Sequence, residues 1–307
     1  MSKNLGKDIM AKKEEKSTAV GVAALRAAAA RERDTAVRNP DYLAISLLSP
    51  GLRALVKLRP LAWLVLRQYH RILPGAYYFH TARTKHIDAV LQQCAKQGME
   101  QLVVLGAGFD TRAYRFQNML TKTKVFEVDH PGTQAIKKER VAKLQGNLPE
   151  NITYVPIDFD AQSLDVLLDF GYSTTVTTLF IWEAVCMYIT PQAVDRILQF
   201  VGHRSGSRSS IVFDYIFQSM VEGRCDYYGA RESSRYVAKR GEPYLFGIEE
   251  GTVAEFLKAR GLHIMSEFTP EMLEQTYLRR SDGKIHGKVY RYTNIVHASV
   301  RPKDSDD

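Results

Sequence analysis

The chain has 307 residues, of which 45% are hydrophobic and 25% are charged, a composition that excludes collagen-like and intrinsically disordered chains. Lysine and arginine together number 42 against 34 aspartate and glutamate residues, so the formal charge of +8 is compatible with an anionic partner without requiring one. The three cysteines, Cys94, Cys186 and Cys225, form no Cys-x-x-Cys pair. This spacing argues against a disulfide framework or a structural zinc site. We therefore expect the protein to reside in the reducing cytoplasm.

Neither a secretory signal nor a membrane span is expected. Residues 1–16 alternate lysine with acidic residues and contain no apolar core, so we expect a flexible tail there. The apolar run 61–66 has only six residues, and the run 178–190 is interrupted by Glu183. Both are too short or too polar to cross a bilayer.

Residues 17–80 are predicted to form an N-terminal helical region. Ser17 is a suitable N-cap, residues 20–33 are rich in alanine and arginine, and Pro60 separates two short amphipathic helices. No acidic residue lies between Asp41 and Asp88, whereas seven basic ones do: Arg53, Lys57, Arg59, Arg67, Arg71, Arg83 and Lys85. We interpret this basic stretch as a solvated helical face, with contact to an anionic substrate or a membrane surface as the alternative.

From residue 81 onward, helical patterns alternate with short runs of β-forming residues, which is typical of a doubly wound parallel sheet. We expect an α/β domain over residues 81–307: a Rossmann-like, seven-stranded, mostly parallel sheet with helices on both faces. The expected strands are 101–106, 125–129, 152–156, 177–182, 210–216, 263–268 and 289–298, and the expected helices include 84–97, 131–144, one opening at Thr190, and 249–260. The polar segment 217–248 is too long for a simple connection and is predicted to be a lid or substrate-recognition insertion.

The first strand runs directly into a glycine-rich turn, Gly106-Ala107-Gly108-Phe109-Asp110-Thr111-Arg112. Ligands of open α/β sheets bind at the carboxyl ends of the strands, and glycine lets the backbone approach them closely. A dinucleotide fingerprint would have a third glycine at position 111, where this chain has threonine. The turn therefore indicates a nucleoside ligand but not a seated pyrophosphate.

Asp129 ends the second strand, 21 residues after Gly108. An acidic side chain at this spacing can reach the two hydroxyls of a ribose. The structural alternative is that Asp129 caps the helix that opens at Pro131. Glu127 lies on the same face of the strand and is the second candidate for the ribose.

Further charged residues lie at the ends of later strands. Asp158 could accept a hydrogen bond from an adenine amine with Phe159 beside the base, although Asp158 or Asp160 could equally cap a helix from residue 161. Glu183 stands in an otherwise apolar run, so burial should force it to pair with a cation. Arg83 is a candidate for that partner or for binding a ligand carboxylate.

Together these motifs resemble the class I S-adenosylmethionine-dependent methyltransferases, and specifically the bacterial branch of the leucine carboxyl methyltransferase-like family. The similarity covers most of the chain. The segments that carry the similarity are residues 17–19 with 25–27, 82–84, 106–112, 126–131, 158–159, 183–185 and 188–191. No pattern for recognising a protein C-terminus is seen in residues 217–248, so protein carboxyl methylation is the less favoured activity.

The resemblance implies S-adenosylmethionine as cofactor and a role for each matching position. Arg83 would bind the cofactor's carboxylate, and Asp129 would bind its ribose. The methionine moiety would be lined by Gly106, Ala107 and Gly108. Asp158 and Phe159 would hold the adenine end, and Glu183 the amino group. The expected activity is O-methylation of a carboxylate or hydroxyl of a small molecule, with no metal ion.

Tyr188 and Tyr215 are predicted to shape the acceptor pocket, and no residue is singled out as a general base. Two alternatives remain open: a catalytically inactive methyltransferase-fold module that binds an anionic partner, and a nucleotide-dependent oxidoreductase. Nucleic acid is not expected as a partner, because the basic residues lack interleaved aromatic side chains.

Overall fold

The computed structural model describes residues 18–300, so the expected tail over residues 1–16 and the predicted Ser17 cap lie outside the described residues. The strands are β1 (Gln101–Leu105), β2 (Lys124–Asp129), β3 (Ile152–Pro156), β4 (Thr178–Trp182), β5 (Ser210–Ile216), β6 (Leu262–Phe268) and β7 (Thr293–Val300). The helices of the first half are α2 (Thr18–Ala29), η1 (Ala44–Leu47), α3 (Pro50–Lys57), α4 (Arg59–Ile72), α5 (Ala76–Lys96), α6 (Arg112–Arg115) and α7 (Pro131–Gln145). Those of the second half are α8 (Val166–Asp169), η2 (Cys186–Tyr188), α9 (Pro191–His203), α10 (Gln218–Val221), α11 (Ala230–Ala238), α12 (Val253–Lys258) and α13 (Pro270–Tyr277).

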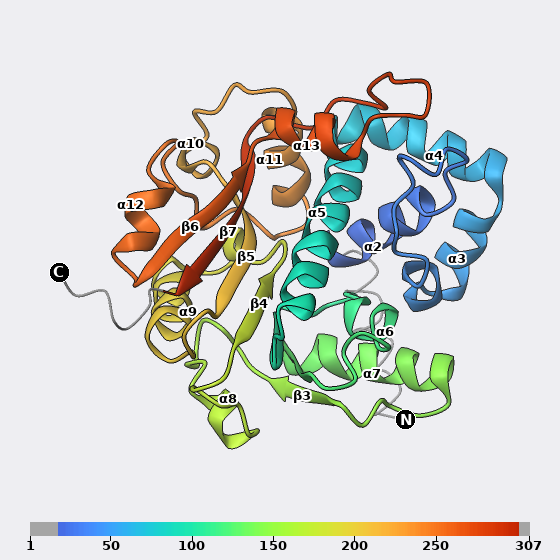
Figure 1. Ribbon diagram of the computed structural model, residues 1–307. Coiled ribbons are helices and arrows are strands. Elements are labelled where there is room, and N and C mark those ends of the chain that lie inside the picture. The colour runs from blue at the N-terminus through green and yellow to red at the C-terminus, as the bar shows by residue number, and fades with distance from the viewer. Residues whose placement is uncertain (1–17, 301–307) are drawn as a thin grey trace, which may run out of the picture.

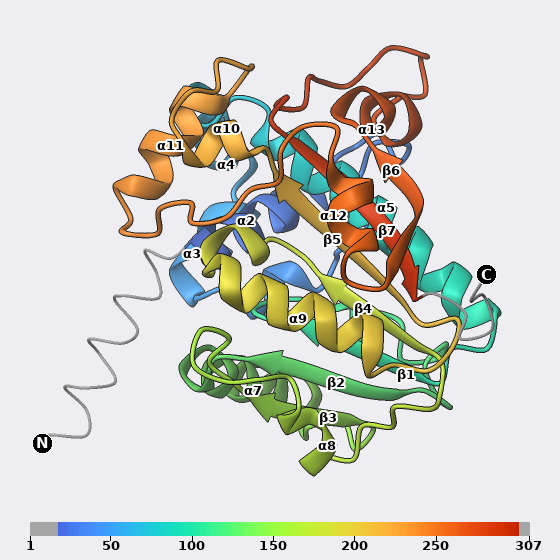
Figure 2. The ribbon, with the colours of Figure 1, turned by 90° about the vertical axis from the view of Figure 1, so that its left-hand side faces the viewer.

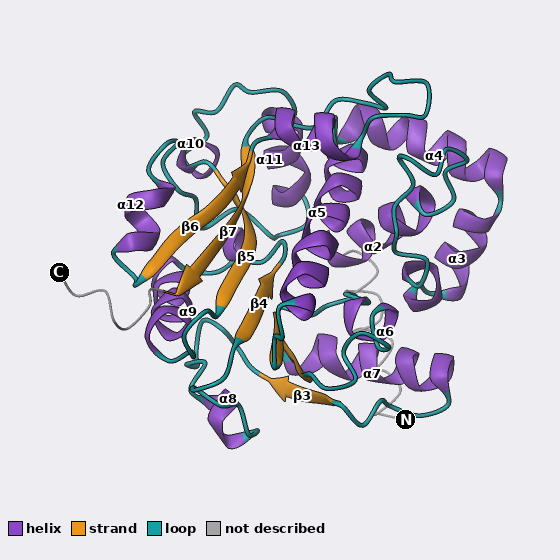
Figure 3. Cartoon of the chain, in the orientation of Figure 1, coloured by secondary structure: helices purple, strands orange, loops and turns teal. Residues whose placement is uncertain are grey.

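The strands form one seven-stranded sheet in the order β3-β2-β1-β4-β5-β7-β6 (Figure 3). Neighbouring strands from β3 to β5 run parallel, and β7 is antiparallel to both β5 and β6. This confirms the predicted mostly parallel α/β sheet. Because β1 lies centrally between β2 and β4, the carboxyl ends of these three strands meet at one edge.

Helices cover both faces of the sheet. Figure 2 shows α9 and α12 in front of the sheet and α5 and α7 behind it. Every residue of β1, β4 and β5 is buried, which explains why their sequences are almost continuously apolar. The hydrophobic core therefore runs through the centre of the sheet.

The N-terminal helices pack on the far side of α5 from the sheet (Figure 1). Helices α3 and α4 are separate, as Pro60 predicts, and this proline sits in the first turn of α4. Helix α5 begins at Ala76, so the domain boundary expected at residues 80 and 81 falls inside one continuous helix. The N-terminal region and the sheet domain therefore share this element. Among residues 18–300, no helix is long and apolar enough to cross a membrane.

Two expected elements differ at their starts. The helix predicted over 249–260 begins only at Val253, because Gly251 adopts a left-handed conformation with φ of +82° that α-helix cannot continue. The last strand begins at Thr293 instead of Val289, because pairing with β5 starts there. Upstream of that point, Tyr290 and Tyr292 stack on one another with ring centroids 4.4 Å apart.

Candidate functional site

A cavity of about 460 Å³ opens at the carboxyl ends of β1, β2 and β4. Its volume is in the range of small-molecule sites. It brings together most of the residues singled out from the sequence: Arg83, Gly106, Ala107, Gly108, Asp129, Asp158, Phe159, Glu183 and Tyr188. These residues come from distant parts of the chain, so the sheet edge places them around one space.

The glycine turn forms the floor of this cavity. Gly106 has a φ of +64°, and a Cβ there would lie 2.2 Å from Cγ2 of Val185. A side chain at position 106 would therefore strain the backbone and clash with the loop after β4. The requirement for glycine is local packing as well as access for a ligand.

The Asp129 carboxylate is held by the backbone. Its Oδ1 accepts a hydrogen bond from the His130 N–H at 2.6 Å, and its Oδ2 accepts one from the Gly108 N–H. Asp129 does not cap α7, because that cap is His130, whose Nδ1 accepts a hydrogen bond from the Gly132 N–H. Burial raises the pKa of Asp129, and the two backbone donors act in the opposite direction. The carboxylate is thus fixed in place at the cavity wall.

Glu127, the second candidate for binding the ribose, is already paired with side chains of the protein. It is fully buried, with Oε1 2.8 Å from Nζ of Lys137, and Oε2 accepts a hydrogen bond from the Tyr114 hydroxyl at 3.1 Å. Glu127 does not line the cavity. Asp129 is therefore the acidic group of β2 that a ligand can reach.

Asp158 is exposed at the cavity rim and Phe159 is buried beside it. No helix begins at residue 161, so the capping alternative for Asp158 and Asp160 is wrong. Asp160 instead accepts hydrogen bonds from the backbone N–H and the hydroxyl of Thr190, which joins this loop to the start of α9.

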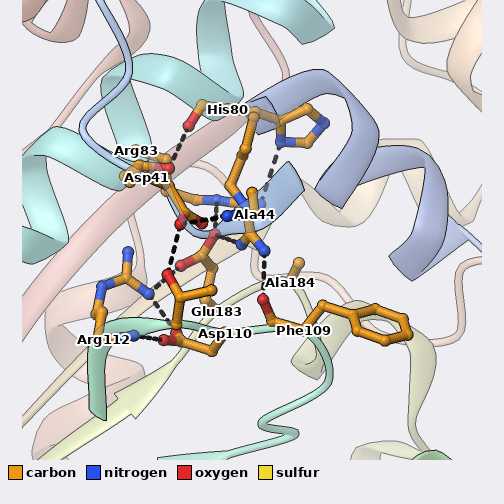
Figure 4. Close-up of polar contacts among 12 residues, drawn as sticks. Asp41, Ala44, His80, Arg83, Phe109, Asp110, Arg112, Glu183 and Ala184 are labelled. Atoms are coloured by element: carbon orange, nitrogen blue, oxygen red, sulfur yellow. Dashed lines mark hydrogen bonds and ion pairs between the residues drawn. The ribbon is translucent and has the colours of Figure 1, made fainter. Parts of the chain in front are cut away.

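Glu183 lies among three arginines from different elements, and Figure 4 labels two of them, Arg83 and Arg112. Its Oε2 is 2.6 Å from Arg112 Nη1, and its Oε1 is 3.0 Å from Arg83 Nε and 3.7 Å from Arg26 Nη1. Burial alone would raise the pKa of Glu183, but the three guanidinium groups together lower it. The predicted pairing of Glu183 with a cation is present, with Arg83 as one of three partners.

Arg83 also contacts Asp214 of β5, with Nη1 2.6 Å from Oδ2. The other oxygen of Asp214 accepts a hydrogen bond from the Ala184 N–H at 2.7 Å. Ala184 has a φ of +59°, a conformation that alanine rarely adopts, so Asp214 holds a strained turn directly after Glu183. His80 lies 3.1 Å from Arg83, and burial and this neighbour hold the pKa of His80 well below its ordinary value.

Sequence reasoning missed three members of this charged cluster: Arg26, Arg112 and Asp214. The signal for Asp214 was available, because it is a lone carboxylate in a buried strand, the same pattern that identified Glu183. Arg112 lay within the quoted glycine motif but had no assigned role. Arg26 lay within the segment 25–27 that carries the family resemblance but had no assigned role, since its contacts with Phe109 and Asp41 come from the folding of α2 over the turn.

The other end of the cavity is lined by tyrosines. They are Tyr69, Tyr188, Tyr236, Tyr244, Tyr290 and Tyr292. The rings of Tyr188 and Tyr244 lie 5.6 Å apart, and the hydroxyls of Tyr244 and Ser233 share a hydrogen bond of 2.8 Å. Burial raises the pKa of Tyr188 and Tyr244, so both remain neutral at physiological pH. The segment 217–248, predicted to be a lid, supplies Ser233 and Tyr244 to this end.

Tyr215 does not reach the cavity. It is fully buried in β5, and its hydroxyl donates to Oε1 of Glu267 at 2.6 Å. Alternation along the strand places Asp214 and Ile216, both cavity residues, on the face opposite to Tyr215. The structure thus assigns Tyr215 to packing, in contrast to its predicted place in the acceptor pocket.

Residues 19–202, more than half of the chain, match the model of the leucine carboxyl methyltransferase family. The chain belongs to this family. It is 28% identical over 218 residues to YktD of Bacillus subtilis, provisionally assigned as an S-adenosyl-L-methionine-dependent methyltransferase, with 71% of each chain covered. A protein of Mycobacterium sp. (strain JLS) with the same provisional assignment is 27% identical, covering 91% of this chain and 94% of its own.

A solved structure of a DUF574 family protein from Streptomyces avermitilis has the same fold. Its TM-score is 0.59 at 14% identity, and 91% of this chain and 97% of that chain are covered. The family and the fold expected from the sequence motifs are therefore both confirmed. This member of the leucine carboxyl methyltransferase family carries the motif residues around one cavity.

Proposed function

We propose that the protein is an S-adenosylmethionine-dependent methyltransferase that methylates an oxygen atom, of a carboxylate or a hydroxyl group, on a small molecule. Family membership and the assignments of YktD and the mycobacterial relative support the cofactor and the reaction class. The observation that carries the proposal is that eight residues chosen for the cofactor line the same cavity, which continues to a tyrosine-lined end.

The nucleoside half of the cofactor fits the rim formed by β2 and β3. Asp129 presents a carboxylate fixed by two backbone donors, which suits the two hydroxyls of a ribose. Asp158 and Phe159 offer an acceptor and an aromatic ring for the adenine end. Phe159 is buried, so its ring is already positioned before a ligand enters.

The amino-acid half fits the charged cluster. Glu183 and Asp214 place negative charge where an ammonium group would be stabilised, and Arg26 and Arg83 supply guanidinium groups for a carboxylate. The close approach allowed by the glycine turn leaves room for the chain between these charges. Opposite charges thus lie side by side, as a zwitterionic ligand requires.

When bound, S-adenosylmethionine supplies a methyl group already activated by its sulfonium. The protein then has to hold the acceptor oxygen in line with that group and exclude water. The neutral hydroxyls of Tyr188 and Tyr244 can orient the acceptor by hydrogen bonds. A carboxylate acceptor needs no base, whereas a hydroxyl acceptor has to lose a proton. His80 lines the cavity, but burial and Arg83 hold its pKa well below its ordinary value, which makes it a weak base.

The decisive experiment is calorimetric titration with S-adenosylhomocysteine of the wild-type protein and of Asp129→Ala. We expect the wild-type protein to bind with micromolar affinity. The affinity of the variant should be about tenfold lower, which corresponds to a loss of ~1.4 kcal/mol of binding free energy. Asp165→Ala is the matched control, because Asp165 is an exposed carboxylate outside the cavity and should leave the affinity unchanged. Failure of the wild-type protein to bind would favour the inactive binding module.

The acceptor chemistry is tested separately with radiolabelled cofactor and a panel of small carboxylic acids, alcohols and peptides. Methyl esters release methanol in alkali and methyl ethers do not, so the product distinguishes the two acceptor types. If only peptides accept the label, the activity is protein C-terminal carboxyl methylation.

We also propose a cytoplasmic location, because all three cysteines are free thiols.

A further inference from the structure

Helix α4 presents an apolar surface that points away from the protein. We define its outer stripe as Leu61, Leu64, Val65 and Ile72, which are 42%, 57%, 40% and 44% exposed. Their spacing of i, i+3, i+4 and i+11 places them on one face of the helix. A helix on a protein surface ordinarily carries polar residues on its outward face, so this stripe needs another explanation.

The outer stripe is not required for packing within the chain. The half-buried residues Ala62, Leu66 and Tyr69 recur at i, i+4 and i+7 and form a second stripe, and Tyr69 also lines the cavity. These residues attach α4 to the rest of the protein. Figure 1 shows α4 at the edge of the molecule, so its other face is open.

Basic side chains flank the outer stripe without a compensating acid. Arg67 and Arg71 lie one turn apart on the same helix, and the Arg67 guanidinium lies 5.5 Å from the ring centre of Trp63. Within residues 18–300, neither arginine has a carboxylate within ion-pair distance. Trp63 itself is 61% exposed. At 100° per residue, Trp63 lies beyond the arginines, on the far side of the helix from Leu61 and Val65. An apolar stripe bordered by arginines, with a tryptophan beyond them, is the composition of helices that lie in a membrane interface.

We propose that α4 docks on the surface of an anionic phospholipid bilayer, with its outer stripe at the acyl boundary and its arginines at the headgroups. Anionic lipid attracts basic residues held near the surface, and the apolar stripe gains by leaving water. A symmetric dimer through this face would cover the outer stripe but offer Arg67 and Arg71 no acid from the facing helix, because α4 contains no acidic residue. Nucleic acid would match the arginines but leave the apolar stripe without a partner. The proposal is independent of the methyl acceptor and of the cofactor.

The chain provides its own reporter for the test. Trp182 is fully buried, so a blue shift of tryptophan fluorescence on adding vesicles reports Trp63, the other of the two tryptophans. We expect the shift, and co-sedimentation of the protein, with vesicles of phosphatidylcholine mixed with phosphatidylglycerol. Vesicles of phosphatidylcholine alone should give neither, and added salt should weaken the binding.

Two variants separate charge from apolar contact. Arg67→Gln with Arg71→Gln should weaken binding to the mixed vesicles by about 30-fold, from the contribution of two basic residues near an anionic surface. Leu61→Ser with Leu64→Ser should remove both the shift and the co-sedimentation. Met265→Ser on β6 is the matched control, because Met265 is 54% exposed on another element and should change nothing. Thermal unfolding checks that each variant is folded.

Three results would overturn the proposal. The first is no binding to the mixed vesicles, and the second is a loss of selectivity: equal binding to neutral vesicles, or wild-type binding by both double variants. The third is a blue shift of Trp63 that appears with rising protein concentration in the absence of lipid, which would identify self-association through this face instead.

Discussion

Glu183→Gln removes a buried negative charge that contacts three arginines while keeping the shape of the side chain. The Glu183 side chain is 8% exposed, and the nearest guanidinium nitrogen, Nη1 of Arg112, lies 2.6 Å away. Removing one partner from a buried ion pair typically costs about 3–5 kcal/mol, because the remaining charges stay buried. For 307 residues the unfolding entropy is about 0.6 kcal/mol/K, so we expect Tm to fall by about 5 to 8 °C.

The pH dependence of this difference tests the electrostatic origin of the loss. The pKa of Glu183 in the folded protein lies below its ordinary value of 4.5. Its contribution is therefore fully present above pH 4.5 and is lost as the pH falls through the lower folded-state pKa. The Tm difference between wild type and Glu183→Gln should thus be largest near neutral pH and shrink in acid, as measured by thermal unfolding monitored by circular dichroism.

The control for this measurement is Asp165→Asn. Asp165 pairs with Arg204 at 3.3 Å on the surface, with both side chains more than half exposed. Such pairs contribute about 0–1 kcal/mol, so Tm should change by less than about 2 °C. If Glu183→Gln lowers Tm no more than this control, or by the same amount at every pH, Glu183 is not the counter-ion of the arginine cluster.

Three further variants test other parts of the site. Asp129→Asn keeps the shape of the side chain but removes its charge, so S-adenosylhomocysteine affinity measured by calorimetry should fall by about tenfold; unchanged affinity would refute the ribose role. Tyr215→Phe loses the hydroxyl contact to Glu267, so chemical denaturation should show a loss of about 1–2 kcal/mol with normal methyl transfer, and lost activity would return Tyr215 to the acceptor pocket. Gly106→Ala should unfold several degrees earlier, with partial recovery in Gly106→Ala/Val185→Ala, because the added Cβ meets the Val185 side chain; no recovery would assign the loss to backbone strain alone.

The fold was predictable because its signals are local. Apolar runs such as that of β4 and caps such as Thr190 specify each element within a few residues. The errors arose where a tertiary contact decides the outcome. Tyr290 has the sequence pattern of a strand residue, but it packs against Phe79 of α5 at 4.6 Å before the strand begins.

The site was predictable in part for the same reason. Asp129 and Glu183 stand at strand ends, so the sheet order alone brings them to one edge. Arg26 reaches that edge from a helix about 80 residues upstream of the glycine turn, through a 2.7 Å hydrogen bond to the Phe109 carbonyl that no spacing rule encodes. Contacts between separate elements of this kind have to be seen in three dimensions.

The two ends of the cavity are stabilised by different interactions, and this difference bears on how acceptor specificity can change. The charged end is built from strand termini and buried ion pairs, so we expect changes such as those at Glu183 to alter stability and cofactor affinity together. The tyrosine end is built largely from the segment 217–248 and the loop before β7. Its residues Tyr188 and Tyr244 are neutral, and Tyr244 shares a hydrogen bond with Ser233. We expect substitutions such as Tyr188→Phe to change acceptor turnover while leaving cofactor affinity intact. The acceptor can therefore differ among proteins of this fold without rebuilding the cofactor site.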